Sequence, residues 1–243
     1  MAGALNFSTM ALPLGILVTG DPVPNVRTAR GSFERMVRET LGAAWEGEVV
    51  VLDAEKGEQP LATELGALVV TGSPASVTSR APWIVDTEAA LAAFVAAGVP
   101  TLGICFGHQL LVQALGGSVT KNPRGREIGT VDFEVLEADP LLGAAPRRLR
   151  VNASHVDSAR RLPPGARLLG HTLLDPYGAA RFGERAWGVQ FHPEFDGEIV
   201  RGYIEARRED IAGEGIELES LASDDTPESA EVLRRFARLA AER

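Results

Sequence analysis

Short apolar runs alternate with amphipathic segments through the first half of the chain. The runs are too short for helices and end at turn-forming or charged residues, so we predict buried strands over residues 14–19, 48–53, 65–71 and 99–104. Apolar residues at helical spacing predict helices over residues 28–41, 83–97 and 108–115. This alternation is typical of a parallel sheet covered by helices on both faces.

The second half of the chain has a different pattern, in which strand-like segments are separated by short turns. These segments cover residues 129–136, 148–153, 166–171, 179–182 and 186–191, and they predict a mostly antiparallel extension of the same sheet. A late helix is expected over residues 199–211. A terminal helix is expected over residues 224–243, with Thr226 as N-cap, Pro227 at the first position and Glu228 in the first turn.

These elements predict an α/β fold, a three-layer sandwich built on one mixed sheet. We find no internal repeat or long linker in the 243 residues, so we expect a single domain over 1–243. Its core should cover about residues 14–205, and residues 206–243 should form a C-terminal helical extension.

The composition of the chain argues against several classes of function. The formal net charge of −9, from 33 acidic and 24 basic residues, argues against a nucleic-acid partner. No apolar run reaches the ~18–20 residues of a membrane helix, and residues 1–13 lack a signal-peptide pattern and should form a loose lead-in. The single cysteine excludes an internal disulfide and a multi-cysteine zinc site. We expect a cytoplasmic protein with no membrane contact and no metal site.

That single cysteine, Cys105, lies where a predicted strand turns into a predicted helix. Gly103 and Gly107 flank it at two residues on each side, as in a nucleophile elbow, where the tight turn needs small neighbours. The N-terminus of the following helix would favour the thiolate. A lone cysteine is otherwise most often a small buried apolar residue. The flanking glycines favour the interpretation of Cys105 as a nucleophile.

A thiol nucleophile needs a base and a group that orients the base. His192 follows a predicted strand in the sequence His192-Pro193-Glu194, so Glu194 could hold one imidazole nitrogen while the other faces the sulfur. The other histidines are weaker candidates: His108 lies in the first turn of the elbow helix, His155 lies in a polar turn and His171 is expected to be structural. An oxyanion hole would need backbone N–H donors, which Phe106 and Gly72 could supply.

Five segments together resemble the class I (triad) glutamine amidotransferases, and the resemblance covers about residues 14–205. They are Thr71-Gly-Ser-Pro-Ala-Ser-Val77, Gly103-Ile-Cys-Phe-Gly-His-Gln109, Arg126-Glu-Ile-Gly129, Ser154-His-Val-Asp157 and Gln190-Phe-His-Pro-Glu-Phe195. The third and fourth segments look most like the amidotransferase domain of GMP synthetase and its stand-alone relatives.

The resemblance implies a flavodoxin-like fold and a role for each matched residue. Cys105 would be the nucleophile, His192 the base and Glu194 its orienting residue, with Gly72 and Phe106 as oxyanion donors. Gln109 and the backbone of Ser154, His155, Val156 and Asp157 would bind the substrate. The implied reaction is hydrolysis of the L-glutamine side-chain amide through a γ-glutamyl thioester on Cys105, without a cofactor.

The sequence does not determine which enzyme, if any, receives the released ammonia, so alternatives stay open. The sequence has no phosphate-binding loop of the Gly-x-x-x-x-Gly-Lys-Ser/Thr type, so we expect the acceptor enzyme to be a separate synthetase subunit. The first alternative is a self-sufficient hydrolase of γ-glutamyl peptides or amides, with a pocket widened by the C-terminal tail or by residues 79–83. A non-enzymatic regulator or scaffold is the weakest alternative, since all three triad positions are present.

Overall fold

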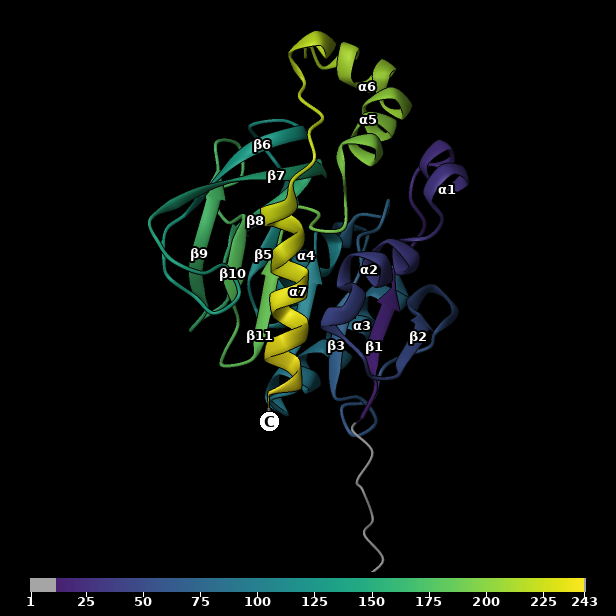
Figure 1. The fold of residues 1–243 in the computed structure, drawn as a ribbon, viewed down its shortest axis with the longest axis vertical. Helices are drawn as coiled ribbons and strands as arrows, with labels where there is room; N and C mark the ends of the chain where they lie inside the picture. The colour runs from purple at the N-terminus through teal and green to yellow at the C-terminus, as the bar shows by residue number, and fades with distance from the viewer. Residues whose placement is uncertain (1–11, 243) are drawn as a thin grey trace, which may run out of the picture.

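The computed structural model describes residues 12–242, and its centre is a sheet of nine strands in the order β2-β1-β3-β4-β11-β10-β9-β6-β7 (Figure 1). The first four predicted strands are present as β1 (Leu14–Val18), β2 (Val49–Asp53), β3 (Ala67–Val70) and β4 (Thr101–Ile104). They are parallel to each other and to β11 (Ala186–Val189), which pairs with β4. The antiparallel extension consists of β10 (Ala179–Arg181), β9 (Arg167–Thr172), β6 (Glu127–Val135) and β7 (Arg147–His155).

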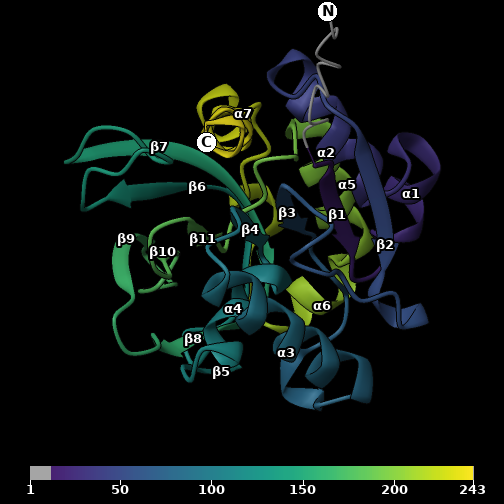
Figure 2. The ribbon, with the colours of Figure 1, turned by 90° about the horizontal axis from the view of Figure 1, so that it is seen from below.

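Helices cover both faces of this sheet (Figure 2). Along β1, Leu14 and Ile16 pack into one apolar cluster and Leu17 into another, as the two-residue period of a strand requires. The first cluster includes side chains of α2 (Phe33–Leu41) and α7 (Pro227–Ala241). The second includes side chains of α3 (Pro82–Ala96) and α4 (Phe106–Ala114). The predicted three-layer α/β sandwich is therefore confirmed.

The helix predicted over residues 28–41 is wrong as a single element, because the chain forms α1 (Pro24–Arg30) and then α2. Gly31 separates them with a φ of 90°, a backbone conformation that favours glycine. Ser32 then caps α2, and its hydroxyl accepts a hydrogen bond from the Arg35 N–H at 3.2 Å.

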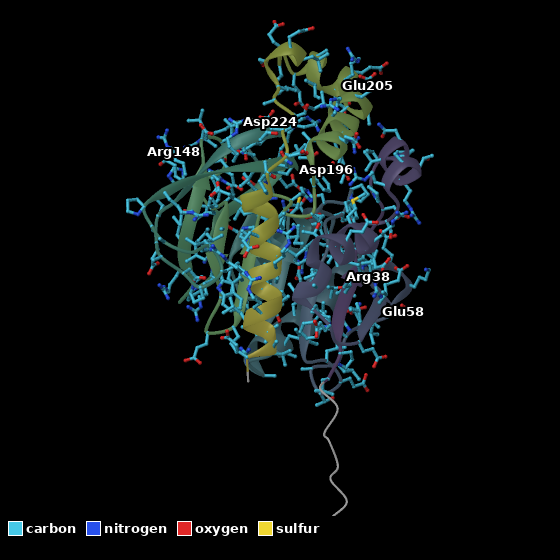
Figure 3. The ribbon with its side chains drawn as sticks, in the orientation of Figure 1. Arg38, Glu58, Arg148, Asp196, Glu205 and Asp224 are labelled. Atoms are coloured by element: carbon cyan, nitrogen blue, oxygen red, sulfur yellow. The ribbon has the colours of Figure 1, made fainter. Side chains whose placement is uncertain are left out.

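The helix predicted over residues 199–211 is also two helices, α5 (Gly197–Ala206) and α6 (Arg208–Gly213). Arg207 leaves helical geometry between them, with φ −108° and ψ 13°. Asp196 caps α5, and its carboxylate accepts from the Ile199 N–H at 2.9 Å (Figure 3). Thr226 precedes α7, but its side chain makes no cap hydrogen bond, because its hydroxyl accepts instead from the Asn152 amide at 3.2 Å.

A small second sheet, formed by β5 (Ser118–Lys121) and β8 (Asp157–Arg161), was not predicted. Both strands are mostly polar, so their hydrophobic pattern is weak. Val119 and Ala159 are their buried contacts with the layer that contains α4. The short 3-10 helices are η1 (Gly42–Ala44), η2 (Ala54–Lys56), η3 (Val77–Ser79) and η4 (Leu218–Ser220).

The predicted lead-in falls mainly on residues 1–11, which lie outside the described residues. Within residues 12–242, no helix combines the length and apolar character needed to cross a membrane. The same part of the chain contains no group of three or more His, Cys, Asp or Glu placed to hold a metal ion.

Candidate active site

Cys105 occupies a strained turn between β4 and α4. Its φ of 51° is positive, and among the described non-glycine residues only Arg80 shares this feature. Such a conformation costs about 1–3 kcal/mol and persists only where surrounding structure imposes it. Here the crowding is severe, because a Cβ on Gly103 would lie 2.4 Å from the Gly107 backbone and one on Gly107 would lie 2.6 Å from the Val70 carbonyl oxygen. The predicted nucleophile elbow is thus present as backbone geometry.

His192 and Glu194 lie beside this turn because β11 is the neighbour of β4. Val189 pairs with Ile104, so the residues after Val189 emerge next to Cys105. The His192 Nδ1 is 2.8 Å from the Glu194 Oε1, and both side chains are buried. Gly72, at the end of β3, closes the group: a Cβ there would lie 2.9 Å from His192 Cε1 and 3.9 Å from Cys105 Cβ. Three adjacent strands therefore bring the predicted triad and one predicted oxyanion donor together.

The electrostatics of this group favour a protonated imidazole. Burial lowers the pKa of His192, but the Glu194 carboxylate, the Cys105 charge and hydrogen bonds with both raise it to about 10. A hydrogen bond to Cys105 on one nitrogen and to Glu194 on the other suits an imidazolium, which donates from both. The imidazole of His192 thus lies between the Cys105 sulfur and the Glu194 carboxyl group in a buried series.

A stack of aromatic rings fixes the plane of the His192 imidazole. The Phe195 ring lies parallel to it, with 4.0 Å between ring centroids and 7° between the planes. Phe33 stacks on the same pair at 6.4 Å from His192, and Tyr203 of α5 packs against Phe195. None of these three aromatic residues was predicted to contact the imidazole, although Phe195 directly follows the His-Pro-Glu segment.

A cavity of about 310 Å³ opens beside Cys105. The residues predicted to bind the substrate all line it together with Cys105 and His192, namely Gln109, Ser154, His155, Val156 and Asp157. Of the two predicted oxyanion donors, Phe106 is among the lining residues and Gly72 is not. The cavity also has a wall that was not predicted, formed by Asp21, Phe33, Arg126, Tyr203 and Arg207 among others. Residues 79–83 are not among its lining residues, whereas Arg207 of the C-terminal extension is.

Comparison with known proteins agrees with this geometry. The family model for "Glutamine amidotransferase class-I" matches residues 29–204, which is more than half of the chain. The chain belongs to the class I glutamine amidotransferase family. This membership makes it an enzyme of the glutamine amidotransferase type.

Its relatives include GMP synthases. A glutamine-hydrolyzing GMP synthase of Thermosipho africanus is 36% identical over 176 residues, covering 70% of this chain and 33% of that protein. A protein of Pyrococcus abyssi, named as one subunit of a glutamine-hydrolyzing GMP synthase, is 42% identical over 97 residues, covering 40% of this chain and 51% of that protein. The chain thus spans between a third and about half of these relatives. A glutamine amidotransferase structure from Thermotoga maritima has the same fold, with a TM-score of 0.72, 24% identity, and coverage of 96% of this chain and 99% of that one.

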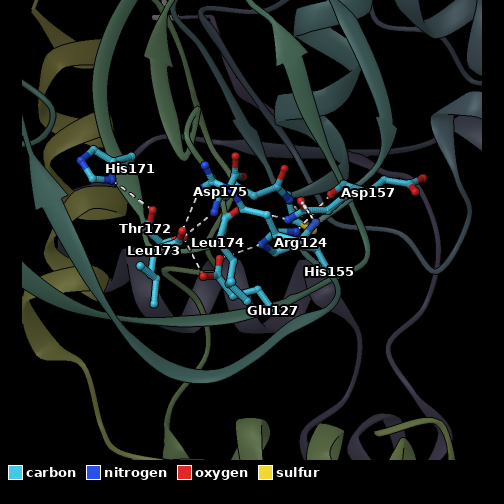
Figure 4. A network of polar contacts seen from close by, with 12 residues as sticks. Arg124, Glu127, His155, Asp157, His171, Thr172, Leu173, Leu174 and Asp175 are labelled. Atoms are coloured by element: carbon cyan, nitrogen blue, oxygen red, sulfur yellow. Dashed lines mark hydrogen bonds and ion pairs between the residues drawn. The ribbon is translucent and has the colours of Figure 1, made fainter. Parts of the chain in front are cut away.

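A second histidine–glutamate pair, formed by His155 of the cavity wall and the buried Glu127, lies in the same polar network (Figure 4). Glu127 and His155 are directly opposite in the β6–β7 ladder, and His155 Nε2 is 3.0 Å from Glu127 Oε2. The His155 Nδ1 faces the Asp157 carbonyl oxygen at 3.0 Å. Both partners are acceptors, so both imidazole nitrogens must carry protons. Burial lowers the pKa of His155, but Glu127, Asp175 and Cys105 raise it to about 9.

Gln109 and Gln190 connect this second pair to the nucleophile. The Gln109 Nε2 donates to the Asp157 carbonyl oxygen at 2.9 Å and to the Gln190 Oε1 at 3.2 Å. The Gln190 Nε2 donates to the Cys105 Sγ at 3.4 Å. No role was predicted for Gln190 from the sequence. A polar side chain directly after the buried strand β11 could have indicated that Gln190 lies at the site.

Arg126 and Asp157, which line the cavity, form hydrogen bonds with neighbouring segments of the chain. The Arg126 guanidinium forms two hydrogen bonds with the Glu214 carboxylate, at 2.9 and 3.0 Å, and thereby fastens the segment after α6 to the cavity. The Asp157 carboxylate accepts a short hydrogen bond from Ser76, which follows β3. The first contact joins the C-terminal extension to Arg126 in the cavity wall, and the second joins the loop after β3 to the predicted substrate-binding segment.

The two remaining histidines do not line the cavity, in line with the sequence-based prediction. His108 is buried with its Nε2 3.1 Å from the Tyr177 carbonyl oxygen, and burial lowers its pKa to about 4. It is therefore a neutral core residue. His171 is partly exposed, with its Nδ1 3.0 Å from the Thr172 carbonyl oxygen.

Proposed function

We propose that this enzyme hydrolyses the side-chain amide of L-glutamine through a Cys105 γ-glutamyl thioester. The observation that carries the proposal is the placement of His192 between Cys105 and Glu194 at the wall of the cavity. In this proposal Cys105 is the nucleophile, His192 the general acid and base, and Glu194 the residue that orients the imidazole.

The first half-reaction uses the charge distribution already present at the site. The Cys105 thiolate attacks the γ-carbon of the glutamine amide, and an S–C bond forms as the carbonyl electrons move to oxygen. The Phe106 and Gly72 N–H groups are the proposed donors to this oxyanion. His192 gives its proton to the amide nitrogen, the C–N bond breaks and ammonia leaves. The raised pKa of His192 supports this order, since the imidazolium is the resting form.

The second half-reaction restores the enzyme. The neutral His192 takes a proton from water, whose oxygen adds to the thioester carbon. The intermediate collapses, the C–S bond breaks, and glutamate leaves with one oxygen from water. The thiolate and the imidazolium are regenerated, and the proton of the new γ-carboxyl group passes to the released ammonia. The balance is glutamine plus water to glutamate plus ammonium.

The size and polarity of the cavity support a small amino-acid substrate. Its volume of about 310 Å³ is at the lower end of the ~300–1,000 Å³ typical of ligand pockets. Gln109 and the segment Ser154, His155, Val156 and Asp157 are the proposed contacts of the α-amino and α-carboxylate groups.

We further propose that the ammonia serves a separate acceptor enzyme. Support comes from relatives named as glutamine-hydrolyzing GMP synthases, of which this chain spans only a part, and from the relative named as one subunit of such an enzyme. We also propose one domain, supported by a sheet that runs through both halves of the chain. A cytoplasmic location is supported by the free catalytic thiol, which a reducing compartment would preserve.

The test combines a glutaminase assay with mass spectrometry of the intact protein after rapid acid quench. With glutamine, we expect ammonia release and a γ-glutamyl adduct that maps to Cys105. The Cys105→Ala variant should lose both. Ammonia release by Cys105→Ala at the wild-type rate would overturn the assignment of the nucleophile.

One observation favours hydrolysis of γ-glutamyl peptides or amides as a second candidate function. The cavity lining includes Tyr203 of α5 and Arg207 of the C-terminal extension, together with His192, the residue that would protonate the leaving amine. Arg207 is partly exposed and is 3.7 Å from Asp210, so its guanidinium could bind the carboxylate of an amino-acid leaving group. This candidate predicts a higher kcat/KM for γ-glutamyl dipeptides than for glutamine, and a selective loss of dipeptide turnover in Arg207→Ala.

A further inference from the structure

A continuous series of hydrogen bonds runs from Thr172, at the end of β9, to the proposed nucleophile. It begins at the Thr172 hydroxyl, which donates to Glu127 at 2.6 Å, and continues through His155 to the Asp157 carbonyl oxygen (Figure 4). It then passes through the side chains of Gln109 and Gln190 and ends at the Cys105 sulfur. The members are buried or line the cavity, where hydrogen bonds act in a low dielectric.

The Asp157 carbonyl oxygen determines the direction of this series. A carbonyl can only accept, so the end of the Gln109 carboxamide that faces it must be the NH₂ group. The second hydrogen of that NH₂ group points to Gln190, whose facing atom must therefore be the oxygen. The Gln190 NH₂ group is then the end that faces the sulfur. Turning either carboxamide around would place two acceptors, or two donors, against each other.

The Cys105 sulfur is the acceptor at the end of the series, and how strongly it accepts depends on whether it carries a proton. Gln190 is 2% exposed, so its N–H groups need partners within the protein. A neutral thiol is a weak acceptor, whereas a thiolate is charged and accepts strongly. The series therefore presents Cys105 with a fixed donor that favours the anion, in addition to His192.

We propose that Gln190 is a catalytic residue whose side-chain N–H stabilises the Cys105 thiolate, and that Glu127, His155, the Asp157 carbonyl and Gln109 orient it. The proposal rests on the proposed function in that Cys105 is the nucleophile. It assigns to the polar residues of β6 and β7 a positioning role that reaches the reacting sulfur.

The test measures the alkylation rate of Cys105 by iodoacetamide as a function of pH, without glutamine. Iodoacetamide is neutral, so the rate reports the thiolate and not the charge of the reagent. The Gln190→Met variant keeps the length of the side chain and removes the donor. We expect its alkylation rate at pH 7 to fall about tenfold, as befits the loss of a hydrogen bond to a charged group, and the pH midpoint to rise.

Gln113→Met is the matched control, since Gln113 lies on the same helix as Gln109 but its side chain contacts Arg80 instead. It should alkylate like the wild type. A Gln109→Met variant should reproduce part of the effect, about twofold to fivefold, because Gln190 loses the partner that orients it. Melting temperatures identify any variant that fails to fold, and Gln190→Glu, which replaces the donor by an acceptor, then supplies the test.

An unchanged alkylation profile in folded Gln190→Met or Gln190→Glu would overturn the proposal. The proposed function fails separately, if the wild type forms no adduct with glutamine. In that case a Gln190-dependent alkylation profile would still support the donor role.

Discussion

His192 and His155 both line the cavity beside Cys105, each histidine is paired with a buried glutamate, and the two pairs look alike. In the His192 pair, the Nδ1 is 2.8 Å from the Glu194 carboxylate; in the His155 pair, the Nε2 is 3.0 Å from the Glu127 carboxylate. Burial opposes protonation in both, and a carboxylate overcomes it in both. The pKa values are raised to about 10 and about 9.

The pairs differ in what the second imidazole nitrogen faces. For His192 it faces the Cys105 sulfur, an atom whose proton affinity changes during a thioester reaction. For His155 it faces the Asp157 carbonyl oxygen, which has no proton to exchange. The first imidazole can transfer a proton, whereas the second can only hold one. The same two residue types thus provide the proposed general acid in one place and a fixed cation in the other.

Exchange of each histidine for glutamine is the strongest test of this difference. His192→Gln removes the proposed acid and base, so kcat should fall by about 10²–10⁴-fold. His155→Gln keeps a donor for one of the two acceptors, so kcat should fall by only about tenfold, together with a rise in KM from a displaced Asp157 carbonyl. Steady-state ammonia release measures both. Equal losses in kcat would contradict the distinction, provided that melting curves show both variants folded.

Replacement of each glutamate by glutamine, Glu194 in one pair and Glu127 in the other, should give a smaller but more specific difference, in the pH dependence of kcat. Glu194→Gln removes the charge that raises the pKa of His192, so the imidazolium should deprotonate at lower pH. The alkaline limb of the kcat profile, which reports loss of the general acid, should move to lower pH. Glu127→Gln lowers the pKa of His155 instead and should leave that limb in place. The measurement is kcat from about pH 6 to about pH 10.5 for the wild type and both variants. A shifted limb in Glu127→Gln would show that His155 takes part in proton transfer.

Much of this candidate site could be predicted from short stretches of sequence, because steric constraints within those stretches determine where the side chains lie. The tight turn at Cys105 requires the glycines that flank it, and β11 places His192 beside the carboxyl end of β4, where Cys105 lies. The layer order also follows from the strand and helix patterns. The break at Gly31 was missed because apolar spacing continues through residues 28–41, and periodicity alone does not register a positive φ.

The second pair could not be predicted, because its chemistry depends on contacts between distant residues. Glu127 and His155 meet through the register of β6 and β7, which the segment patterns do not fix. The donor role of Gln190 depends on the Asp157 carbonyl, a backbone atom that no residue type reveals. Residue identity was therefore enough to propose a nucleophile and its base, whereas the contacts that favour protonation of His155 are visible only in the three-dimensional structure.

The smallest expected effect is on the pH dependence of the free energy of unfolding, which should reveal the contribution of the His155–Glu127 pair separately from that of the His192–Glu194 pair. The folded-state pKa of His155 is raised above its unfolded value of about 6.5, so the pair stabilises the protein fully below about pH 6.5. This contribution is lost as the pH rises through about 9. In a Cys105→Ala, Glu194→Gln background, which reduces the contribution of His192, the free energy of unfolding should still fall from about pH 6.5 to about pH 9.5. Adding Glu127→Gln should flatten this slope, and urea unfolding at each pH measures it. A slope that persists without Glu127 would mean that another group holds the proton.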